Sequence, residues 1–187
     1  MERTPNPPLA TARLRLDPQV RGHAEAMLRV LADPRIYAFI PTDPPTDLAT
    51  LAARYERLES RRSPDERELW LNWIAFCGDD AIGTVEATVH LERSSTAIAY
   101  LFDPARWGHG YAREAVRGVL DHLEHAGQTA VFTAHIDTRN QASRRLVEQL
   151  GFLQVGTIEG ADTFKGSVSD EAVYVLTAHR ADCRHDT

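Results

Sequence analysis

The stretch from Ser95 to Ala126 constrains the fold more than any other part of the chain. Residues Ser95–Phe102 are apolar on both faces, which is typical of a strand in the middle of a sheet. A loop with two glycines follows, Trp107-Gly108-His109-Gly110-Tyr111-Ala112. After it, apolar residues recur with a helical period at Ala112, Ala115, Val116, Val119, Leu120 and Leu123. This order predicts a strand and a helix joined by a tight loop.

The loop has the chemistry of an anion cradle. Glycines let the backbone turn sharply and approach a ligand without a Cβ in the way. The helix that follows presents unpaired N–H groups and the positive end of its dipole, which suits a pyrophosphate. A pair of glycines can also mark nothing more than a turn. The loop is neither a Rossmann fingerprint nor a P-loop, because Ala112 stands where a glycine is needed and no Gly-Lys-Ser/Thr follows.

Periodicity and turn residues predict the other elements in a definite order. We expect a strand over Thr11–Leu16, a helix capped by Asp17-Pro18 and reaching Leu31, a helix over Thr46–Leu58, strands over Glu68–Phe76 and Ala81–Leu91 around Gly78-Asp79-Asp80, a strand over Ala130–Ile136, a helix over Asn140–Leu150, and strands over Leu153–Phe164 and Glu171–Thr177 around Lys165–Asp170. Strands that precede a βαβα unit predict an α/β fold whose mixed, mostly antiparallel sheet is flanked by helices. We expect one domain over residues 1–187, with loose ends at 1–10 and 179–187.

Composition and charge exclude several classes of protein. No apolar run approaches the roughly 20 residues of a membrane helix, and the N-terminus does not resemble a signal peptide. We therefore expect a cytoplasmic protein with no membrane partner. The formal net charge of −6 argues against general binding of nucleic acid and is compatible with a cationic substrate such as an amine.

Cysteines and histidines do not predict a metal site. Cys77 and Cys183 lie far apart in the chain and are expected to be unpaired thiols, with a catalytic role as the minor alternative. His122 and His125 are three residues apart on a predicted helix, but no third ligand is evident, so we expect two surface residues and no metal.

Two motifs together resemble the GNAT superfamily of N-acetyltransferases. The stretch from Trp107 to Ala115 is similar to that superfamily's acyl-CoA pyrophosphate motif. The run from Asn140 to Leu146, ending in Leu150-Gly151-Phe152, resembles its second cofactor motif. The early Thr11–Leu16 resembles the first strand of the branch that includes ribosomal-protein N-terminal acetyltransferases, and the likeness extends over residues 11–177.

One position departs from the general pattern of the superfamily. Trp107 stands where the general pattern has a Gln or Arg. The ribosomal-protein branch often has an aromatic residue at this position. The neighbouring Arg106 can supply a hydrogen-bond donor instead.

The resemblance implies acetyl-CoA as co-substrate and assigns residues to it. The backbone N–H groups of the loop, including its residues His109, Tyr111 and Ala112, would hold the pyrophosphate. Leu101-Phe102-Asp103 would pair with the pantetheine arm like an added strand. Asn140, Ser143 and Arg145 belong to the second cofactor motif, with Asn140 contacting the pantetheine and Ser143 close enough to the sulfur to protonate the leaving thiolate.

Each of these residues also has a purely structural interpretation. Asn140 is a good N-cap, and Ser143 can bond to backbone in the first turn of the helix. As a loop residue, His109 can simply be exposed to solvent.

Acetyl transfer needs a neutral amine, so a base must remove a proton at neutral pH. Glu86 is the first candidate, since it shares the polar face of an otherwise apolar strand with Thr84, Thr88 and His90. Half-burial would raise the pKa of its carboxyl. The alternative is a glutamate on the solvent face of the strand. His135 is a second candidate, for which a core histidine is the structural interpretation.

The expected reaction is direct attack of a primary amine on the thioester in a ternary complex, with backbone N–H groups near Phe102 stabilising the oxyanion. The acceptor is a protein N-terminus or a small molecule, and the fold does not choose between them. A protein of another class, a catalytically silent module that binds or senses acyl-CoA, stays open. The sequence also leaves the oligomeric state open, a homodimer included.

Overall fold

The computed structural model describes residues 6–127 and 129–178. The described residues form one sheet with the strand order β1-β2-β3-β4-β5-β6-β8-β7. Its strands are β1 (Leu9–Ala10), β2 (Arg15–Pro18), β3 (Glu68–Cys77), β4 (Asp80–His90), β5 (Ser95–Phe102), β6 (Val131–Asp137), β7 (Leu153–Phe164) and β8 (Ser167–Thr177). Only β5 and β6 pair in parallel, and every other neighbouring pair is antiparallel. The predicted mixed, mostly antiparallel sheet is confirmed.

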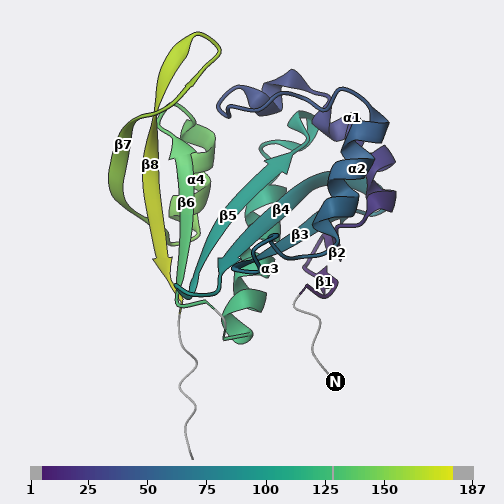
Figure 1. Cartoon of the computed structure of the whole chain (residues 1–187), viewed down its shortest axis with the longest axis horizontal. Coiled ribbons are helices and arrows are strands. Elements are labelled where there is room, and N and C mark those ends of the chain that lie inside the picture. Colours follow the sequence, from purple (N-terminus) through teal and green to yellow (C-terminus); the bar gives the residue numbers. More distant parts are fainter. Residues whose placement is uncertain (1–5, 128, 179–187) are drawn as a thin grey trace, which may run out of the picture.

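Helices cover both faces of the sheet (Figure 1). They are α1 (Ala24–Leu31), α2 (Leu48–Leu58), α3 (Tyr111–His125) and α4 (Gln141–Gln149), with short 3₁₀ helices η1 (Arg21–His23), η2 (Pro34–Tyr37) and η3 (Pro104–Arg106). Among the described helices, none combines the length and apolar character needed to cross a bilayer.

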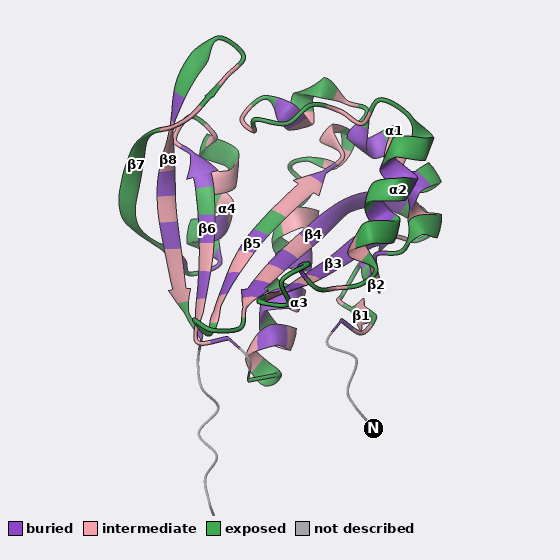
Figure 2. Ribbon diagram, in the orientation of Figure 1, coloured by how far each residue is buried: buried purple, intermediate pink, exposed green. Residues whose placement is uncertain are grey.

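Two hydrophobic clusters place the helices. Trp73 and Val85 point to one face, where they pack with α3 residues such as Val119. Ile74 and Met27 belong to a second cluster on the other face, built by α1 and α2. Successive side chains of a strand point to opposite faces, so β3 is buried on both sides. Figure 2 shows the buried residues concentrated along β3 and β4.

The N-terminal predictions need correction. Asp17 and Pro18 do not start a helix but end strand β2, opposite Ile74 and Trp73 of β3. Leu16, which is fully buried, anchors this strand to the core, and proline is tolerated at a strand end because little pairing is lost there. The helical segment therefore begins only at η1, and Thr11 to Leu14 form the turn between β1 and β2.

Residues 6–10 are not loose either. Asn6 is buried and its amide donates to the Asn72 carbonyl, while the Trp73 indole donates to the Pro7 carbonyl at 2.9 Å. Residues 1–5 and 179–187, with Cys183, lie outside the described residues.

The final hairpin is tighter than expected. The predicted loop Lys165–Asp170 is a turn of two residues, Lys165 and Gly166, after which β8 begins at Ser167. Both turn residues have positive φ, 50° and 76°, which is the backbone of the two-residue hairpin turns that match the twist of the flanking strands. Pairing of β7 with β8 therefore reaches the turn, where Phe164 lies opposite Ser167, and the register shifts on the way, between Ile158 and Asp162.

Candidate active site

The sheet splits between β5 and β6. The two strands pair only over Ser95–Ala97 and Val131–Thr133. Beyond these residues they diverge into an open V (Figure 1) while β5 stays paired with β4 up to Phe102. The edge of β5 from Ile98 to Phe102 therefore has no strand partner on the β6 side, and such an edge can accept an extended chain. Leu101 and Phe102, predicted to pair with pantetheine, lie on this edge, and Asp103 follows it.

The glycine loop lies at the end of this edge. After β5, the short helix η3 and Trp107 lead into Gly108 and Gly110, whose φ angles are +79° and +78°. L residues rarely adopt this conformation, which explains the glycines. Gly110 is also the N-cap of α3, so the loop passes directly into the first turn of the helix, at Tyr111 and Ala112.

The loop presents a row of free donors. Among the described residues, none accepts a hydrogen bond from the backbone N–H groups of residues 108–113. A Cβ built on Gly108 meets nothing within 4 Å, so the loop is open to solvent at this residue. Unpaired N–H groups at a helix N-terminus, together with the helix dipole, make an anion-binding cradle.

A salt bridge from the N-terminal hairpin holds the cradle in place. The Arg13 Nε atom lies 2.6 Å from Glu114 Oε2, and Arg13 Nη1 donates to the His109 carbonyl at 3.0 Å. Glu114 Oε1 accepts from the Thr11 hydroxyl and from the Arg13 backbone N–H, at 2.6 and 2.7 Å. Burial raises the pKa of Glu114, but hydrogen bonds from Thr11 and Arg13 outweigh it and hold that pKa below its usual value. We did not predict this clamp from the sequence.

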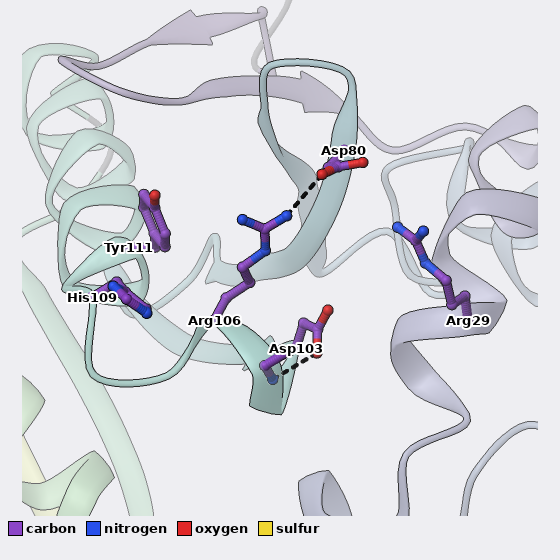
Figure 3. Close-up of a pocket in the computed structure, with 7 residues that line it drawn as sticks. Arg29, Asp80, Asp103, Arg106, His109 and Tyr111 are labelled. Carbon is purple, nitrogen blue, oxygen red and sulfur yellow. Dashed lines mark hydrogen bonds and ion pairs between the residues drawn. The ribbon is translucent and has the colours of Figure 1, made fainter.

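A cavity of about 420 Å³ adjoins the loop (Figure 3). Arg106 points into it and bonds to Asp80 at 2.7 Å, and Arg29 lies on the opposite wall. The Asp103 carboxylate accepts from the Ala105 N–H and caps η3. Arg106 is therefore placed beside the cradle, although a carboxylate already partners it.

Three more side chains of the loop lie near this cavity. His109 and Tyr111 line the cavity, and Figure 3 shows both on its α3 side. His109 is exposed, as a loop histidine can be. Trp107 is 52% exposed and its indole donates to the Phe102 carbonyl at 2.8 Å, so it folds back along the end of β5.

Glu86 lies in the middle of β4, on the face that α1 and α2 cover in part. Its neighbours across the sheet are Asn72 and Ala99. The side chain keeps part of its surface exposed, so it is neither a free surface residue nor sealed in the core. Burial raises the pKa of Glu86, opposed by the positive charge of Arg54. Among the described residues, none donates a hydrogen bond to its carboxylate.

Two tyrosines share the surroundings of Glu86. Burial raises the pKa of Tyr37 and of Tyr55, and the charge of Glu86 contributes to both shifts. The Lys165 ammonium at the tip of the β7–β8 hairpin donates to the Tyr37 carbonyl. The hairpin thus contacts η2, the element that carries Tyr37.

The second cofactor motif caps α4. Asn140 Oδ1 accepts from the Ser143 N–H at 3.1 Å, so the N-cap interpretation of Asn140 describes its contact in this structure. The Tyr100 hydroxyl, on β5, reaches across the split and donates to the Ser143 carbonyl at 3.3 Å. Burial raises the pKa of Tyr100 to about 12, against a smaller opposing effect of hydrogen bonding with Ser143. Sequence reasoning missed Tyr100, whose signal was a hydroxyl in an apolar strand.

The other residues that the sequence singled out have different surroundings. Arg145 is exposed on α4. His135 is not a core histidine: it is exposed on β6 and lies 3.2 Å from Glu171, because it points away from the face covered by α3 and α4. His122 packs edge-on against Trp73. Within residues 6–127 and 129–178, no group of three or more His, Cys, Asp or Glu is arranged to hold a metal ion.

Comparison with known proteins places this arrangement in a family. Residues 13–153 match the model of the acetyltransferase (GNAT) domain, so the chain belongs to the GNAT acetyltransferase family. It is 22% identical to the uncharacterized N-acetyltransferase p20 of Bacillus licheniformis over 169 residues, which are 90% of this chain and 94% of that protein. It is 41% identical to the uncharacterized protein YkkB of Bacillus subtilis over 61 residues, or 33% of this chain and about a third (36%) of that protein.

Solved structures share the fold. The ribosomal L7/L12 α-N-protein acetyltransferase RimL in complex with coenzyme A superposes with a TM-score of 0.81 at 17% identity, covering 91% of this chain and 97% of that chain. The acetyltransferase of Salmonella typhimurium that modifies the N-terminal serine of L7/L12 gives 0.80 at 15% identity, covering 90% and 97%. These solved structures therefore have the same overall fold as this chain.

Proposed function

We propose that this protein moves the acetyl group of acetyl-CoA to a primary amine by direct attack in a ternary complex. The observation that carries the proposal is the split between β5 and β6, which leads from the free N–H groups of residues 108–113 to the half-buried Glu86. The solved RimL structure with coenzyme A has the same fold, which supports the choice of co-substrate.

In this proposal the cofactor follows the split. The pyrophosphate binds the cradle of residues Gly108–Ala112, and pantetheine adds to the β5 edge at Leu101 and Phe102. Asn140 and Arg145 contact the cofactor from α4, where the Asn140 amide N–H₂ has no acceptor among the described residues. The thioester carbonyl then lies beside the β5 edge, whose free N–H groups near Phe102 stabilise the oxyanion.

The proton leaves through Glu86. An amine nitrogen attacks the acetyl carbon, forming the C–N bond, and Glu86 accepts the amine's proton directly or through one water. Collapse of the tetrahedral intermediate breaks the C–S bond, and the electron pair stays on sulfur. Ser143 returns a proton to the thiolate, with Tyr100 beside it as an alternative donor.

An acceptor screen tests this function. Purified protein is mixed with acetyl-CoA and panels of amino-terminal peptides, amino acids and polyamines, and released thiol is followed together with the mass of the product. Thiol release that depends on the amine, with a gain of one acetyl group, is the expected result. Tight binding of acetyl-CoA with no transfer to any amine would instead indicate a silent acyl-CoA-binding module.

A further inference from the structure

A second cavity, of about 770 Å³, lies where α2 ends and β3 begins. Its wall carries Arg54 and Arg57 from α2 and Arg62 from the segment that follows, and Trp70 of β3 contributes an apolar surface. One carboxylate, Glu66, also lines it. Three arginines and one acidic residue therefore line this cavity, in a chain whose formal net charge is −6.

These three arginines differ from Arg21 and Arg35 in the same half of the molecule. Arg21 pairs with Glu56, and Arg35 pairs with Asp33 at 2.6 Å. Within the described part of the chain, Arg54, Arg57 and Arg62 make no salt bridge or side-chain hydrogen bond. Their planar donor groups are free to bind carboxylates, which guanidinium groups recognise in a bidentate manner.

The cavity adjoins the proposed base. Trp70 lies opposite Thr88, and Asn72 lies opposite Glu86, so Trp70 and Glu86 are diagonal neighbours on one face of the sheet. Diagonal neighbours on a sheet lie about 7–8 Å apart. Arg54 is close to both the cavity and Glu86, because it lines the cavity and its charge opposes the rise that burial causes in the pKa of Glu86. A molecule with its amine at Glu86 can thus extend into the arginine cavity.

Building on the proposed function, we propose that the acceptor is the amino terminus of a peptide whose next residues are acidic. The amine lies at Glu86, and the carboxylates that follow bind Arg57 and Arg62 above Trp70. Three arginines carry more positive charge than one carboxylate neutralises, so the cluster fits several acidic groups in succession. The cavity is within the size range of sites that hold drug-sized ligands, which leaves room for two or three peptide residues.

Two matched peptides test the inference. Both begin with serine, and the next two residues are Glu-Glu in one and Gln-Gln in the other. Native protein should acetylate the acidic peptide with a kcat/KM about tenfold higher, equivalent to roughly 1.4 kcal/mol. The double variant Arg57→Gln/Arg62→Gln should lose this preference and keep its KM for acetyl-CoA and its rate on the neutral peptide. Arg54 is left intact because it acts on Glu86.

A control variant and a binding measurement sharpen the result. Arg117→Gln removes one positive charge from α3, on the opposite face of the sheet, and should keep the preference. Calorimetry of the native protein should show that the acidic peptide binds. Its affinity should fall at about 0.5 M salt, because salt screens interactions between exposed charges. This arm needs no catalysis.

Three results would overturn the inference: equal rates on the two peptides, a preference that persists in the double variant, or free glutamate outperforming every peptide. If no amine is acetylated, the proposed function falls, and calorimetry alone then decides whether the arginine cavity binds acidic peptides.

Discussion

Arg13 and Glu114 are 101 residues apart in the chain and joined by a salt bridge of 2.6 Å. The pair fastens the hairpin of β1 and β2 to the first turn of α3. Because Arg13 also donates to the His109 carbonyl and stacks over the Tyr111 ring at 4.5 Å, it orients the loop from outside. The conformation of the cradle therefore depends on the backbone of its glycines and also on Arg13, a residue from the N-terminal part of the chain.

The first prediction concerns this clamp. Arg13→Ala should raise the Kd for acetyl-CoA about fivefold, because loss of an exposed ion pair and its orienting bond is worth about 1 kcal/mol. Titration calorimetry measures it. Arg15→Ala, which removes the neighbouring pair with Asp17, should leave the Kd unchanged. Equal effects of the two variants would show that the clamp does not position the loop.

The second prediction concerns the rate at Glu86. Glu86→Gln should lower kcat at pH 7 about 10²–10⁴-fold, the usual contribution of general base catalysis, with little change in acetyl-CoA affinity. Because burial raises the pKa of Glu86, native kcat/KM should fall as pH drops through a value above the roughly 4.3 of an ordinary glutamate. Full activity of Glu86→Gln at pH 7 would remove this residue from the mechanism.

The same raised pKa predicts a stability effect. The folded protein binds the Glu86 proton more tightly than the unfolded chain does. This contribution to stability is fully present at low pH and is lost as pH rises through the folded pKa. Glutamine stays neutral, so the melting temperature of Glu86→Gln relative to native protein should rise between pH 4 and pH 8. Glu25→Gln, at an exposed position on α1, is the control. A difference independent of pH would contradict the raised pKa.

The fourth prediction separates two donors for the leaving thiolate. Ser143→Ala should slow turnover about 10²–10⁴-fold with acetyl-CoA binding intact if its hydroxyl is the acid. Tyr100→Phe is the companion variant, because the Tyr100 hydroxyl bonds to Ser143 and its pKa, raised to about 12 by burial, keeps it protonated at neutral pH. Steady-state kinetics decide between them. A change below about twofold for Ser143→Ala would leave Ser143 as a residue of the helix start.

Local pattern predicted most elements of this fold. The period of α3, the alternation of β4 and the glycine loop each depend on neighbours within a few residues, and all three appear where expected. The error at Asp17-Pro18 has a different origin. That pair is a good helix start locally, but pairing of Leu16 with Ala75, 59 residues away in sequence, keeps it in a strand.

The site shows the same division. Gly108, Gly110 and Glu86 could be proposed from the sequence, because a two-glycine loop and an alternating strand are local patterns. Arg13, Tyr100 and the arginine cavity could not, because each depends on which distant segments the sheet brings together. Among the predicted residues, Arg145 makes no contact in the described structure that assigns it a role.

The most direct test of the account is acetyl-CoA binding by native protein and Gly110→Val in a thermal-shift assay. Valine is strained at the φ of +78° found at Gly110, and its Cβ would lie 3.6 Å from Arg13 Nη2, so its branched side chain would disturb both the loop backbone and the Arg13 clamp. Gly127→Val imposes similar strain at the end of α3, where φ is +70°, and serves as the control. Acetyl-CoA at 100 times its Kd should stabilise native protein and Gly127→Val by roughly 2.7 kcal/mol. Gly110→Val should show no shift, and adenosine without phosphates should stabilise none of them. An absent shift in native protein at millimolar acetyl-CoA, or an equal shift in Gly110→Val, would contradict the claim that this loop binds the cofactor.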